Sequence, residues 1–67
     1  MKAVQPYPTE KRVRLATCVA KFGDNAVADA AGVYSGTVLR VVGGKGVTPA
    51  IAAALDRAVH HLAPAAP

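Results

Sequence analysis

The sequence contains little sulfur, few aromatic side chains and no long apolar segment. A single cysteine, Cys18, stands among 67 residues, which excludes an internal disulfide framework and fits a reducing compartment. Two Tyr and one Phe are too few for the stacking platform that binds single-stranded nucleic acid. No apolar run reaches the roughly 18 residues that span a bilayer, and Pro6, Pro8, Glu10 and Lys11 interrupt any signal-peptide core. We therefore expect a cytoplasmic protein that has no membrane partner.

Acidic residues are also scarce. Four Asp and Glu stand against eight Lys and Arg, which gives a net charge of +4 and a pI near 9.7, and this balance favours a polyanionic partner. The acids are scattered and no nucleophile–base pair is apparent, so we expect no enzymatic activity. His60 and His61 are adjacent on one predicted helix and point in different directions, so we also expect no metal, cofactor or small-molecule ligand.

The length allows one small domain. About half of the residues are apolar, which favours a folded chain over a disordered one. A core of this size supplies no more than about 3–5 kcal/mol, so pairing with a second copy would add stability. The two prolines near the start predict an N-terminal arm over residues 1–8. The folded domain is expected over 9–62 and a disordered tail over 63–67.

Apolar periodicity and capping signals predict four helices, and therefore an all-α compact domain. The first is expected over 10–22, with Thr9 as N-cap and an apolar stripe of Leu15, Cys18, Val19 and Phe22. The second is expected over 25–31 with Asp24 as N-cap, the third over 35–42, and the fourth from Pro49 to Leu62 with Thr48 as N-cap. The third segment is rich in β-branched residues and also fits a strand paired with Val47 across Gly43-Gly44. Pro49 ends that partner at once, and an isolated hairpin is marginal in water, so the helix is favoured.

Residues 24–43 have the pattern of two short helices joined by a tight turn. Gly32 stands at the turn, and Ala28 provides the small side chain that a close helix crossing needs. The apolar positions expected to point inward and form a shared core are Val27, Ala31, Val33, Val38 and Val41.

The segment Val27-Ala28-Asp29-Ala30-Ala31-Gly32-Val33, followed by Thr37-Val38-Leu39-Arg40-Val41-Val42-Gly43, resembles the helix-turn-helix of bacterial and phage repressors. It is similar to the LacI-type headpiece, in which an alanine-glycine-valine turn precedes a threonine-valine-x-arginine-valine recognition helix. The preceding helix and Gly44-Lys45 are more similar to the small Cro and phage-repressor group. The resemblance covers roughly residues 22–62.

The resemblance implies that residues 35–43 enter the major groove of double-stranded DNA. Arg40, Ser35, Gly36 and Tyr34 are then the base-contacting residues, and the Arg40 fork matches the O6 and N7 atoms of guanine. Gly36 departs from the family, where a longer polar side chain is common, and Tyr34 replaces the usual serine or threonine cap. The residues expected to contact phosphates are Asn25, Thr37, Lys45, Thr48 and, from the basic cluster of the first helix, Arg14.

One recognition helix spans too few base pairs for useful specificity, so a homodimer on an inverted repeat is expected, with half-sites about 34 Å apart. The expected dimer surface is the apolar face of the last helix, formed by Ile51, Leu55, Val59 and Leu62. Packing of part or all of this face against the first helix is the alternative. These expectations combine into a sequence-specific transcriptional repressor of the kind found in phages and mobile elements. Two alternatives stay open: a helical protein–protein adaptor of the antitoxin or antirepressor type, and a non-specific DNA-packaging protein.

Overall fold

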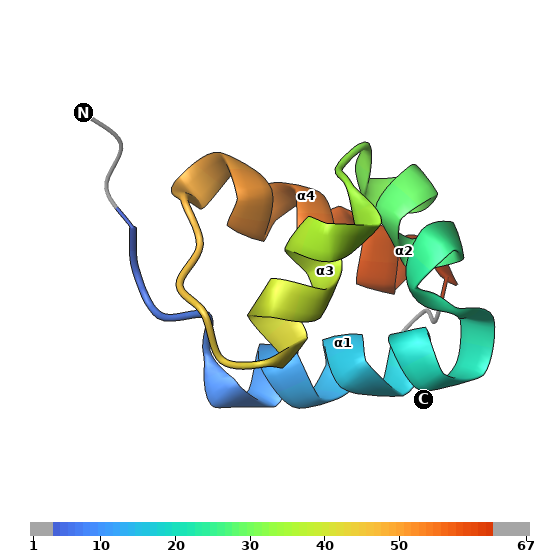
Figure 1. Cartoon of the computed structure of the whole chain (residues 1–67), viewed down its shortest axis with the longest axis horizontal. Coiled ribbons are helices and arrows are strands. Elements are labelled where there is room, and N and C mark those ends of the chain that lie inside the picture. Colours follow the sequence, from blue (N-terminus) through green and yellow to red (C-terminus); the bar gives the residue numbers. More distant parts are fainter. Residues whose placement is uncertain (1–3, 63–67) are drawn as a thin grey trace.

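Glycine and proline set the ends of four helices in the computed structural model, which describes residues 4–62 (Figure 1). The helices are α1 (Thr9–Phe22), α2 (Asp24–Ala31), α3 (Ser35–Val42) and α4 (Pro49–Leu62). The predicted all-α fold class is confirmed, and the ambiguous third segment is a helix. Residues 1–3 of the expected arm and the expected tail at 63–67 lie outside the described residues.

Two of the predicted N-caps are wrong. Thr9 and Asp24 are the first residues of α1 and α2 and not their caps, and no side-chain hydrogen bond caps either helix. Between them, Gly23 ends α1 with a φ of 92° and donates its N–H to the Val19 carbonyl. Because few L-residues adopt such a φ, glycine at this position allows α2 to begin one residue after α1 ends.

The core gathers apolar side chains from all four helices, from the N-terminal segment and from the loop between α3 and α4. Its largest fully buried members are Leu15, Val27, Val38, Val41 and Leu55. Burial of one such side chain contributes about 1.5–3 kcal/mol. Phe22, which was predicted to belong to the α1 stripe, remains 39% exposed, because it is the last residue of its helix.

The prediction that Leu55 lies at a dimer interface is wrong. Its side chain is completely buried within the monomer, where α4 packs against α2 and α1. The other three residues of the predicted dimer surface, Ile51, Val59 and Leu62, are partly buried and pack against the same core. The apolar face of α4 therefore points into the domain itself.

The part of the predicted arm that the structure describes is attached to the domain. Gln5 forms an antiparallel bridge with Val47, through backbone hydrogen bonds of 2.8 and 2.7 Å. Two residues later, Tyr7 is buried and its hydroxyl donates a 2.7 Å hydrogen bond to Asp56 on α4. In Figure 1 the N-terminal segment accordingly runs beside the loop that links α3 to α4. This loop is thereby held at a fixed position beside the end of α3.

Candidate nucleic-acid interface

The turn between α2 and α3 has the geometry that its sequence predicts. Gly32 adopts a left-handed conformation, with φ 72° and ψ 32°, and the Val33 N–H donates to the Ala28 carbonyl at 3.0 Å. This is the hydrogen-bond pattern of a glycine-terminated helix. Ala28 is 4% exposed and Val27 is fully buried. Both side chains of α2 therefore point into the core, as predicted. The arrangement fits a helix-turn-helix.

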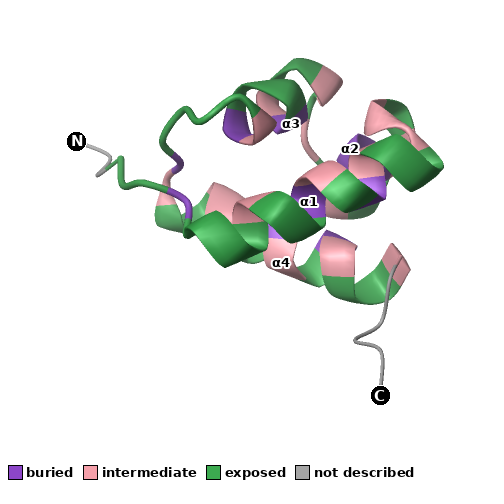
Figure 2. Ribbon diagram, turned by 90° about the horizontal axis from the view of Figure 1, so that it is seen from below, coloured by how far each residue is buried: buried purple, intermediate pink, exposed green. Residues whose placement is uncertain are grey.

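One side of α3 faces away from the domain. Val38 and Val41 are buried, whereas Gly36, Leu39 and Arg40 are exposed; we refer to these three exposed residues as the outer face of α3. They are spaced at i, i+3 and i+4, so they are neighbours on one helix surface. Figure 2 shows buried, intermediate and exposed residues along α3.

The remaining predicted base-contacting residues lie at the start of α3. Tyr34 precedes the helix in an extended conformation, with φ −78° and ψ 147°, and does not cap it with its side chain. Its ring is 86% exposed, the highest value among the large hydrophobic side chains that the structure describes as exposed. Ser35 is half-buried, as is the predicted phosphate contact Thr37. Tyr34 and Arg40 are thus the most accessible of the side chains predicted to contact bases.

Basic groups from three segments lie around the C-terminal end of α3. Arg40 comes from the helix itself, and the exposed Lys45 follows it, with its N–H bonded to the Arg40 carbonyl at 2.9 Å. Arg12 reaches this loop from α1, because its Nη1 atom lies 3.0 Å from the place that a Cβ of Gly44 would occupy. A φ of 99° at Gly44 and the missing side chain allow this approach. Three basic residues thus come from segments that meet at this end of α3.

The predicted phosphate contact Arg14 is not brought to this cluster. Two residues correspond to about 200° around a helix, so Arg14 projects from the side of α1 opposite to Arg12. Arg12 lies beside the loop, and no local feature distinguishes the two arginines, which belong to the same basic cluster.

Two other predicted phosphate contacts are placed by helix starts. Asn25 is exposed in the first turn of α2, where N–H groups and the helix dipole favour an anion. The Thr48 Oγ1 atom accepts the Ile51 N–H at 3.4 Å, which confirms Thr48 as the cap of α4. This bond leaves the hydroxyl proton of Thr48 available as a donor.

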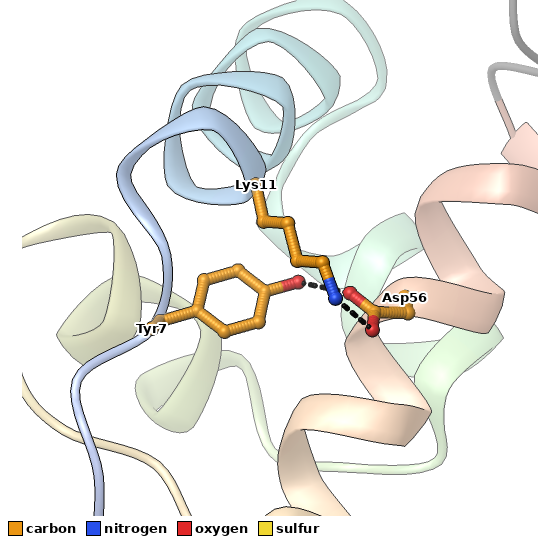
Figure 3. A network of polar contacts seen from close by, with 3 residues as sticks. All are labelled: Tyr7, Lys11 and Asp56. Carbon is orange, nitrogen blue, oxygen red and sulfur yellow. Dashed lines mark hydrogen bonds and ion pairs between the residues drawn. The ribbon is translucent and has the colours of Figure 1, made fainter.

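Negative charge is absent from this part of the sequence. No Asp or Glu occurs between Asp29 and Asp56, and Asp56 is engaged by two donors. Figure 3 shows the Tyr7 hydroxyl and the Lys11 amine meeting at its carboxylate, and Lys11 forms a 2.9 Å ion pair with it. Partial burial raises the pKa of Asp56, but the hydrogen bonds from Lys11 and Tyr7 outweigh burial and the pKa lies below its usual value. Among residues 4–62 this is the only ion pair, so Arg40 has no carboxylate partner there.

Other chemistry-bearing groups are separate from this surface. Cys18 is buried in the core, and burial raises the pKa of its thiol although Lys21 lowers it slightly. A thiol with a raised pKa is a poor nucleophile. In the described part of the chain no three His, Cys, Asp or Glu residues gather as a metal site would require, and no helix there is long and apolar enough to cross a membrane.

Two residues at or near the interface, Leu39 and Tyr7, were missed by sequence reasoning. Leu39 was expected only as part of an apolar segment, yet it is 50% exposed beside Arg40. Helical spacing alone places Leu39 on the same side of the helix as Gly36 and Arg40, and this could have indicated its exposure. The buried Tyr7 carries no comparable local signal, because its role is defined by contact with the distant Asp56.

Comparison with protein-family models, with curated proteins and with solved structures gave no match to this chain. The resemblance to small repressors therefore depends on the residues and the geometry described above.

Proposed function

We propose that this protein is a sequence-specific double-stranded DNA-binding regulator that inserts the outer face of α3 into the major groove. The observation that carries the proposal is the exposed Arg40, which has no carboxylate partner among residues 4–62, on a helix that follows the glycine turn at Gly32. Arginine matches guanine through two hydrogen bonds. Lys45 and Arg12 would meet the adjacent phosphates, which orient a protein on the duplex without specifying sequence.

We further propose that two copies bind an inverted repeat and repress by occupying a promoter. The outer face of α3 spans only a few base pairs, and one such contact does not distinguish a site within a genome. Two half-sites about one helical turn apart would double the number of specified positions. Because the apolar face of α4 belongs to the core, this proposal does not use α4 as the dimer surface.

A selection experiment tests the proposal. Duplexes with a randomised segment are enriched by binding to the protein. Fluorescence anisotropy at physiological salt then compares affinity for a labelled, selected duplex with affinity for a labelled, scrambled duplex. We expect affinity for the selected duplex to exceed that for the scrambled duplex by about 10³-fold or more. Sedimentation of the complex should give two copies per duplex.

The two alternative functions give different outcomes. A non-specific packaging protein would bind both duplexes equally, with affinity that falls steeply as salt increases. A protein–protein adaptor would bind neither duplex at moderate salt. Either outcome would overturn the proposal.

A further inference from the structure

Leu39 is an aliphatic side chain on the surface that α3 turns away from the core. It is 50% exposed, while its neighbours Val38 and Val41 are buried. About half of this apolar side chain therefore remains in contact with water, and its burial against an apolar group of a partner would be favourable. Leu39 lies directly beside Arg40, the residue to which we assign guanine contact.

The surroundings of Leu39 are open. Apart from its chain neighbours and the backbone of its own helix, nothing lies within 4 Å of the place that a Cβ of Gly36 would occupy, so the domain does not require glycine there for packing. Gly36 and Leu39 are one helical turn apart. Glycine at that point removes the side chain that would otherwise stand between α3 and an approaching surface, so Leu39 can make close contact.

The basic surroundings determine the kind of occupant. Arg40, Lys45 and Arg12 border this part of the molecule, and the sequence has no acid between Asp29 and Asp56. A partner for this surface needs an apolar group for Leu39 and negative charge for the basic residues around it. The major groove of DNA supplies both. Its walls are phosphates, and its single apolar group is the C5-methyl of thymine.

We propose that Leu39 contacts a thymine methyl in the half-site whose guanine Arg40 contacts. Consecutive Cα atoms are about 3.8 Å apart and bases of one strand are about 3.4 Å apart along the axis. The thymine therefore lies within about two base pairs of the guanine. This inference depends on the proposed function, and it adds a second specificity-determining residue and the chemical group that this residue recognises.

The test replaces thymine by deoxyuridine, which lacks the methyl group and keeps the hydrogen bonds of the pair. Each thymine of the selected half-site is replaced in turn, and affinity is measured by fluorescence anisotropy with wild-type protein and with Leu39→Ala. For wild type we expect about a fourfold loss at one thymine, the value of one buried methyl group. Leu39→Ala should bind both duplexes alike, and Leu39→Met should restore the difference, because methionine keeps an apolar contact.

Val13→Ala serves as the matched control. Val13 is an aliphatic residue on α1 with 58% exposure and no assigned role, so this variant should show the same fourfold loss as wild type. Circular dichroism checks that each variant is folded. The inference is overturned if no thymine shows a methyl effect, or if the effect persists in Leu39→Ala. A failure to select any preferred duplex overturns the proposed function as well, so the two failures are distinguishable.

Discussion

Helices α3 and α4 differ in how much of their apolar surface the domain itself covers. On α4, Ala54, Leu55 and Ala58 are buried, and the helix leaves no large apolar side chain exposed within the described residues. On α3, Val38 and Val41 are buried, whereas Leu39 remains exposed beside an unpaired arginine. Periodicity marks the residues that a small domain needs for its core, and the residues outside that pattern mark the surface available for binding.

The largest expected effect separates the leucines of these two helices. Leu55→Ala should lower the free energy of unfolding by about 2–5 kcal/mol, because it opens a cavity in the core. Leu39→Ala should change it by no more than about 0.5 kcal/mol, as exposed substitutions do. Urea unfolding followed by circular dichroism measures both. Equal costs for the two variants would mean that Leu39 belongs to the core and that α3 has no free apolar residue.

The next largest effect concerns binding. Arg40→Ala should remove preference at one base pair per half-site and cost about 1–3 kcal/mol of binding free energy. Lys45→Ala should weaken binding to all duplexes equally and lower the salt slope by about one. Arg57→Ala on α4, also exposed, is the control for lost charge and should leave base preference unchanged. A uniform loss of affinity in Arg40→Ala would assign this residue to phosphate contact.

Replacing two glycines of the α2–α3 unit by alanine should change the free energy of unfolding in opposite directions. Gly32→Ala should lower the free energy of unfolding by about 1–2 kcal/mol, because a left-handed φ of 72° is strained for alanine. Gly36→Ala lies within α3 and should raise stability by about 0.5–1 kcal/mol, because alanine loses less backbone entropy in a helix. Neither position has a neighbour within 4 Å of the new Cβ. Thermal unfolding of the two variants compares them directly, and stabilisation by Gly32→Ala would refute the turn geometry.

Local signals were sufficient for most of the fold. The α3 bounds at Ser35 and Val42 agree with prediction, and Gly32 and Ala28 occupy the turn and the crossing that their small size indicated. The assignment of Leu55 failed because a helical stripe defines one face of a helix and says nothing about which surface covers it. The same pattern serves a core and a dimer interface.

Long-range contacts could not be predicted. Tyr7 lies between two prolines, a pattern typical of an arm, yet its hydroxyl bonds to a carboxylate 49 residues away. Nothing in the sequence near Tyr7 or Asp56 indicates this pairing. The same holds for Arg12, whose place beside Gly44 depends on how α1 packs against the loop.

The smallest expected effect tests how the N-terminal segment is attached. The lowered pKa of Asp56 means that its bonds to Tyr7 and Lys11 stabilise the fold above the unfolded-state pKa of about 3.9. This contribution is lost as pH falls through the lower folded-state pKa. Because the side chains of Lys11 and Asp56 are 50% and 38% exposed, we expect it to be below about 1 kcal/mol.

Urea unfolding of wild type and Asp56→Asn is compared at pH 7 and at about pH 2.5 to 3, below the usual carboxyl pKa of about 3.9. The comparison of the two proteins separates the effect of Asp56 from that of the other three acids. Wild type should be the more stable protein at neutral pH, and the difference should shrink in acid as Asp56 becomes protonated. A difference that stayed constant with pH would show that shape and hydrogen bonding, not charge, attach the segment. The N-terminal segment, and with it the loop beside α3, would then be held equally well in acid.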